Sequence, residues 1–151
     1  MRALAALTEA ARLRDAKPPV DPAALGVLFD SSDAAIRRAA VQLAGAWKAA
    51  ALVSRLTALA AGEDRVVVFA ALRDIGGNTV VNALTKLVAA DSSASPEVRR
   101  EAVVVLAALN ANAALPAVVA TLRATTGEAE AQALWRALLG DRKSTRLNSS
   151  H

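Results

Sequence analysis

The sequence repeats itself with a period of 31 residues, and this repeat constrains the fold more than any other feature. Alanine recurs at the centre of four similar apolar segments, at Ala40, Ala71, Ala102 and Ala133. A period of about 20 to 50 residues is typical of repeat proteins, in which each unit packs against its neighbours in the chain. We therefore interpret most of the chain as consecutive copies of one structural unit.

Each unit is predicted to be a pair of helices. A second apolar segment follows each repeat alanine in the same register, and Val53, Leu84 and Leu115 mark it. The chain is 54% hydrophobic but only 3% aromatic, and alanine, which favours helices, supplies much of the apolar content. We expect helices at residues 3–16, 21–30, 33–46, 49–61, 65–75, 78–90, 96–109, 112–125 and 128–139, and no strands.

Residues that start and stop helices agree with these boundaries. Ser32 precedes Asp33, and Ser95 precedes Pro96, so each pair places a capping side chain before a first turn. Asp21 with Pro22 marks another start. Gly76 and Gly77 supply backbone conformations that end helices.

Two first helices resemble those of HEAT repeats. Residues 33–40 (DAAIRRAA) and 96–102 (PEVRREA) show the loose pattern of that family: an acid, an aliphatic residue followed by Arg, and Ala three residues later. The middle unit departs from the pattern, because Val68 stands where Arg is usual. The resemblance implies a right-handed α-solenoid of about four helical hairpins over residues 1–140. Such a solenoid would be a non-catalytic scaffold that binds another protein or spaces neighbouring domains.

A narrower resemblance concerns residues 43–48 (LAGAWK), 75–77 (IGG) and 133–135 (ALW). They are similar to the HEAT arm of large secreted bacterial proteins that join a dehydrogenase-like propeller to a c-type cytochrome. Haem attachment in that family needs Cys-x-x-Cys-His, and the chain contains no Cys. Redox chemistry would then belong to flanking sequence. This alternative implies a periplasmic or secreted parent, whereas a complete chain would be cytoplasmic.

The last eleven residues, 141–151 (DRKSTRLNSSH), differ abruptly in composition from the preceding sequence, which is rich in Ala, Leu and Val. They resemble the translation of a common sequencing adapter, and a natural basic tail is the alternative. We expect this segment to lie outside the folded domain. It carries three of the 18 Lys and Arg residues and one of the 14 Asp and Glu residues, so the net charge without it falls from +4 to +2.

Two matching arginine pairs are the candidate interaction residues: Arg37 with Arg38, and Arg99 with Arg100. Arginine suits phosphate recognition, so a nucleic-acid-binding module is one hypothesis. The small net charge and the absence of lysine clusters make that hypothesis the weaker one. A structural role is the alternative: Arg37 would pair with Asp33 one helical turn away, and Arg99 would span the interface between repeats.

Residue types that catalyse reactions or bind metals are scarce. The chain has no Cys, and its one His, His151, lies in the atypical tail. Asp30, Asp33 and Asp64 stand near helix starts, where capping explains them better than a catalytic pair. We expect no catalytic residue, no metal site and no cofactor, and no segment is apolar enough over 18 residues to span a membrane.

Two further expectations concern the tryptophans and the end of the repeat array. Trp47 and Trp135, the only large aromatics besides Phe29 and Phe69, are expected to pack in the core, and a role as interface anchors is the alternative. The period makes residues 128–139 the first helix of a fourth full unit, whose partner helix would begin where the tail begins. An apolar face around Trp135 would then lack a covering helix, so we expect self-association or fraying at this end.

Overall fold

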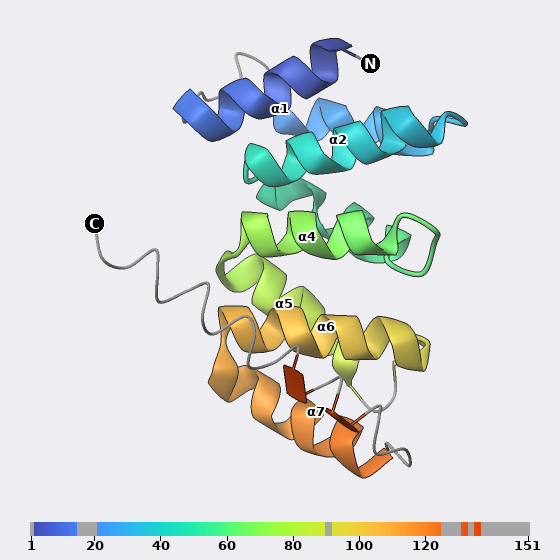
Figure 1. The fold of residues 1–151 in the computed structure, drawn as a ribbon, viewed down its shortest axis with the longest axis vertical. Helices are drawn as coiled ribbons and strands as arrows, with labels where there is room; N and C mark the ends of the chain where they lie inside the picture. The colour runs from blue at the N-terminus through green and yellow to red at the C-terminus, as the bar shows by residue number, and fades with distance from the viewer. Residues whose placement is uncertain (1, 15–20, 90–91, 125–130, 133–134, 137–151) are drawn as a thin grey trace. The chain divides into compact units, whose positions relative to one another are not determined.

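The computed structural model describes residues 2–14, 21–89, 92–124, 131–132 and 135–136. The regular elements of this part of the chain are helical and include no strand, which confirms the predicted all-α class. They are α1 (Arg2–Arg14), the 3₁₀ helix η1 (Pro22–Asp30), α2 (Ala34–Ala46), the 3₁₀ turn η2 (Ala50–Leu52), α3 (Val53–Leu59), α4 (Arg65–Ile75), α5 (Gly77–Val88), α6 (Pro96–Leu109) and α7 (Ala111–Ala124) (Figure 1). Most of the predicted helix 128–139, including Ala133, and the whole tail 141–151 lie outside the described residues.

Hydrogen bonds confirm the predicted caps at Asp21 and Ser95, whereas α2 is capped by Asp33 and not, as the sequence predicts, by Ser32. The side chain of Asp33 accepts from the backbone N–H of Ala35 at 2.8 Å, and Ser95 accepts from Val98 at 3.4 Å. Asp21 accepts from the N–H of Ala23 at 2.9 Å at the start of η1. Each bond satisfies a donor that the helix itself leaves unpaired.

Two predicted α-helices differ in kind from the prediction. The segment 21–30 forms a 3₁₀ helix of nine residues, whose buried residues are Leu25, Gly26 and Phe29. The segment 49–61 splits into η2 and a short α3, after Lys48 takes a positive φ of 52°.

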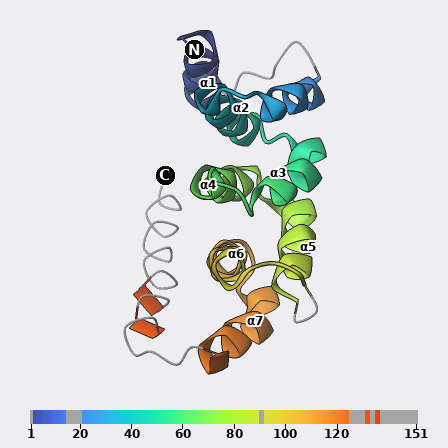
Figure 2. The ribbon, with the colours of Figure 1, turned by 90° about the vertical axis from the view of Figure 1, so that its right-hand side faces the viewer.

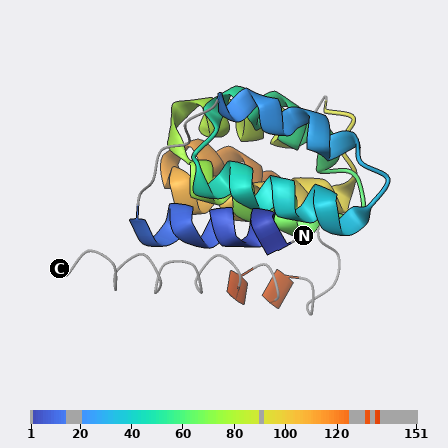
Figure 3. The same cartoon turned by 90° about the horizontal axis from the view of Figure 1, so that it is seen from above.

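The chain divides into two compact units, and the first comprises residues 1–83. In it, α2 contacts α1, α4 and η1. Figure 2 shows α1, α2 and α4 in one layer, with η1 and α3 in a second layer beside them. In the view from above, α2 lies between α1 and η1 (Figure 3). The fully buried side chains include Leu43, Leu56 and Leu72, which come from both layers.

Small residues set the spacing between α2 and α4. A Cβ atom added to Gly45 would lie 2.9 Å from Cα and 3.2 Å from Cβ of Ala71. Ala40 and Ala71 are 0% and 2% exposed. The repeat alanines of this unit therefore lie where the period predicts them, in the packed interior. Gly45 lies within the last turn of α2, where the lack of a side chain allows this close approach.

A tight turn links α4 to α5. Gly76 has φ 61° and ψ −161°, and Gly77 has φ 76°. Residues other than glycine rarely adopt these conformations. Gly76 ends α4 as predicted, whereas Gly77 is the first residue of α5.

The second compact unit comprises residues 84–151, and the boundary between the units falls within α5. In this unit α6 contacts α7. Asn110 alone separates the two helices, and its side chain accepts from the N–H of Ala113 at 3.0 Å, which caps α7. Ala102, Val103, Leu106 and Ala114 are each no more than 1% exposed, so the third repeat alanine is also a core residue.

Candidate functional site

Arg37, Arg38 and Asp64 form a cluster of charged side chains that bind one another. Nε of Arg37 donates to Oδ2 of Asp64 at 3.1 Å, and Nε of Arg38 donates to Oδ1 at 2.6 Å. Each carboxylate oxygen thus accepts from one arginine. The two arginines lie on α2 and Asp64 directly precedes α4, so the cluster joins two helices that the repeat places side by side.

Arg37 makes a second set of bonds. Its Nη1 donates to the backbone carbonyls of Ser31 at 2.9 Å and Ser32 at 3.3 Å. The side chain therefore fixes the loop before its own helix and the start of the next repeat helix. This corrects the expected pairing with Asp33, which instead caps α2 through Ala35.

Asp64 stands at the repeat position where other units cap a helix, but its side chain binds two arginines instead. Asp33, Asp64 and Ser95 are 31 residues apart, yet only Asp33 and Ser95 make a side-chain capping bond. The hydrogen bond from Arg38 contributes most to lowering the pKa of Asp64 below its usual value of 3.8. Burial opposes this effect, while the bond from Arg37 and both positive charges lower the pKa further. Asp64 therefore occupies the N-cap position of α4, near the start of the helix as expected, but makes no side-chain capping bond, and its carboxylate serves as an ionic link.

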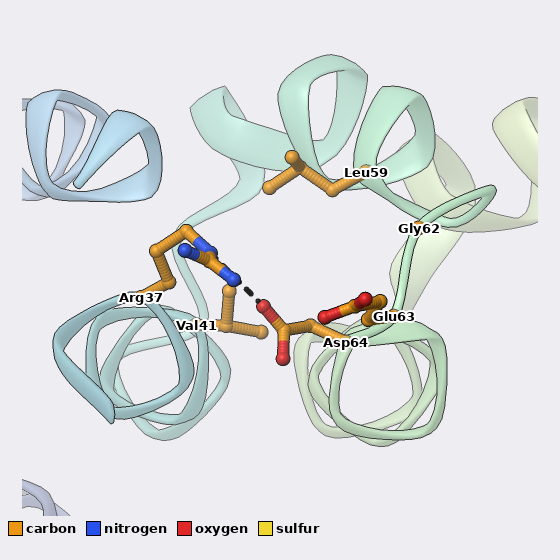
Figure 4. A pocket seen from close by; sticks show the side chains of 6 residues that line it. All are labelled: Arg37, Val41, Leu59, Gly62, Glu63 and Asp64. Carbon is orange, nitrogen blue, oxygen red and sulfur yellow. Dashed lines mark hydrogen bonds and ion pairs between the residues drawn. The ribbon is translucent and has the colours of Figure 1, made fainter. Parts of the chain in front are cut away.

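A shallow cavity lies beside this cluster. Its volume is about 190 Å³, and its lining comes from α2, α3 and the turn before α4: Arg37, Val41, Leu59, Gly62, Glu63 and Asp64 (Figure 4). A water molecule occupies roughly 30 Å³ of liquid volume, so the space is comparable to a few waters. Two of its three charged groups, those of Arg37 and Asp64, are paired with each other and so join two helices (Figure 4). Glu63 is the third charged side chain of the lining.

Arg99 repeats part of the arrangement in the second unit. Its Nε donates to the carbonyl of Ala94 at 3.0 Å, and Nη2 donates to that of Ser92 at 2.8 Å. Nη2 of Arg100 lies 3.7 Å from Oε1 of Glu97 on the same helix. Arg99 thus holds the loop before its own helix, as Arg37 does. The expectation that Arg99 spans a repeat interface is corrected to this local role.

Sequence reasoning missed one further contact. Nη2 of Arg55, on α3, donates to Oδ2 of Asp30 at 2.7 Å, and its guanidinium carbon lies 5.8 Å from the ring centre of Phe29. This side chain fastens η1 to α3. The two residues of the ion pair are 25 positions apart, so neither helical spacing nor the repeat period indicates the pair.

The two tryptophans differ in burial. Trp47 is half-buried at the end of α2, and Trp135 is 50% exposed. The expectation of core packing is wrong for Trp135, and most of the apolar face predicted around it lies outside the described residues.

No group of three or more His, Cys, Asp or Glu side chains among the described residues could hold a metal ion. None of the described helices is long and apolar enough to cross a membrane. Comparisons with models of known protein families, with curated proteins and with solved structures found no match.

Proposed function

We propose that residues 1–140 form a right-handed α-solenoid of HEAT type that acts as a non-catalytic scaffold, binding another protein or spacing neighbouring domains. The observation that carries this proposal is the burial of the repeat positions. Ala40, Ala71 and Ala102 are at most 2% exposed, and Gly45 packs directly against Ala71. A 31-residue period that coincides with helix contacts is what a stack of equivalent hairpins requires.

The use of the polar side chains supports the same proposal. Arg37 and Arg38 share one carboxylate across two helices, and Arg99 bonds backbone carbonyls. These arginines are already engaged in stabilising the fold. A phosphate-binding site would instead present several guanidinium groups toward solvent.

The decisive experiment uses the full-length gene that encodes this chain. Its product should be compared with a variant that lacks residues 1–140. A scaffold is expected to change partner binding, or the distance between flanking domains in small-angle scattering, while the turnover of any flanking enzyme is unchanged. If the flanking domains stay folded but lose turnover, residues 1–140 take part in catalysis and the proposal fails.

The same gene distinguishes the narrower alternative. A Cys-x-x-Cys-His sequence downstream, or a propeller upstream, would assign the solenoid to a dehydrogenase–cytochrome protein. Nucleic-acid binding is tested separately by fluorescence anisotropy with a DNA duplex at low and moderate salt. Salt-sensitive binding that Arg38→Gln weakens would replace the scaffold proposal.

A further inference from the structure

The cavity between α2, α3 and the turn before α4 contains one charged group that the fold leaves free. Glu63 has no hydrogen-bond or ion-pair partner among the described residues. Its side chain is exposed, and Figure 4 shows its carboxylate beside that of Asp64 in the cavity wall. Both carboxylate oxygens of Asp64 already accept hydrogen bonds from arginines. Glu63 is therefore the anionic acceptor that the cavity offers to a ligand.

The charged side chains that line the cavity carry one negative charge in excess. Arg37 contributes one positive charge, and Glu63 and Asp64 contribute two negative charges. Three hydrogen bonds hold the Arg37 guanidinium on Asp64 and on the loop before α2, so it does not pair with Glu63. Arg38 also binds Asp64 but is not part of the lining. A cationic group at Glu63 would gain an ion pair, whereas an anionic group would face an unpaired carboxylate.

Apolar side chains form another part of the wall. Val41 on α2 and Leu59 on α3 line the cavity, and Gly62 adds no side chain to it. A Cβ atom added to Gly62 would meet the carbonyl oxygen of Leu59 at 3.4 Å and no other listed atom within 4 Å, so this side is open. Lysine combines a straight apolar stem with a terminal ammonium. The cavity volume of about 190 Å³ suits one such side chain, since an atom the size of water takes roughly 30 Å³.

We propose that this cavity receives a lysine side chain of the protein that the scaffold binds. The stem lies along Val41 and Leu59, and the ammonium donates to the carboxylate of Glu63. An acidic peptide gains no such contact, because Glu63 repels its carboxylates. The source of the lysine rests on the proposed scaffold function, whereas the chemistry of the site rests on the cavity alone.

Nuclear magnetic resonance titration of the isotope-labelled chain with Nα-acetyl-lysine methylamide tests the site. We expect the amide signals of residues 59–64 to shift. Glu63→Gln should weaken binding by about fivefold, the scale of a partly exposed ion pair. Glu9→Gln is the matched control, because Glu9 is exposed on α1 and does not line the cavity, so the same change of charge there should leave the affinity unchanged. Circular dichroism verifies that both variants keep their helix content.

Ligand analogues separate the charge of the side chain from its shape. The norleucine analogue lacks the ammonium and should bind about fivefold more weakly than the lysine derivative. Absence of the expected shifts, an affinity that Glu63→Gln leaves unchanged, or equal binding of the norleucine analogue overturns the proposal. Tighter binding of butylammonium than of the lysine derivative would assign the cavity to a free amine and also overturn it. These titrations use the 151-residue chain, so their failure leaves the scaffold proposal to its own test in the full-length gene.

Discussion

Asp64→Asn removes the negative charge that joins α2 to the start of α4 while keeping the side chain nearly the same size. In the native protein each oxygen of Asp64 accepts from a different arginine. An asparagine has one acceptor oxygen, so one of the two bonds is lost outright and the other loses its ionic character.

The exposure of the partners sets the size of the effect. Asp64 and Arg37 are 11% and 24% exposed, so their bond is on the scale of buried charged hydrogen bonds, about 1.5–3 kcal/mol. Arg38 is 50% exposed, and solvent screens its bond to about 0–1 kcal/mol. The Arg38 bond is the shorter and contributes most to the lowered pKa, but we expect screening to make the Arg37 bond the more stabilising. We therefore expect Asp64→Asn to reduce the free energy of unfolding by about 2 kcal/mol at neutral pH.

The loss should depend on pH in one direction. The folded protein lowers the pKa of Asp64 below 3.8, so this carboxylate stabilises the fold above that value. The stabilisation is lost as pH falls through the lowered pKa, because the folded state must then take up a proton. The difference between wild type and Asp64→Asn should therefore be constant near neutral pH and shrink under strongly acidic conditions.

Urea unfolding followed by circular dichroism measures both effects, and double-mutant cycles with Arg37→Met and Arg38→Met separate the two bonds. Asp30→Asn is the control, because Asp30 and Arg55 form an equally short but exposed pair, expected to contribute only about 0–1 kcal/mol. A loss for Asp64→Asn no larger than that of the control, or one that does not shrink on acidification, would refute the role assigned to the cluster.

Three further outcomes test the fold. Ala71→Leu should overpack the contact with Gly45 and cost about 1–3 kcal/mol, with hydrogen exchange protection falling first in α2 and α4; a neutral result would show that the repeat register is wrong. Gly76→Ala should cost about 1–3 kcal/mol in thermal or urea unfolding, because its φ of 61° with ψ of −161° is strained for alanine. Deleting residues 141–151 should change stability by no more than about 0.5 kcal/mol, and a clear loss in thermal unfolding would show that the tail belongs to the fold.

The sequence alone determined the helical class, most helix boundaries and the buried repeat alanines of the described units. These features depend on local chemistry: apolar spacing along one helix, capping side chains within three residues of the N–H they bind, and glycines that end helices. The predicted ranges 65–75 and 96–109 match α4 and α6. The period added the positions at which helices meet, because equivalent residues in a repeat have equivalent neighbours.

Only the tertiary structure decided which polar groups bind one another. Asp33 and Asp64 occupy the same repeat position, yet one caps a helix and the other binds two arginines 26 and 27 residues away. In the same way the structure, not the sequence, paired Arg55 with Asp30 and left Leu115 exposed where Leu84 is buried. A capping bond is decided within a single turn of chain. An ion pair or a covered face is decided by which helix lies alongside, and that depends on how the repeats pack.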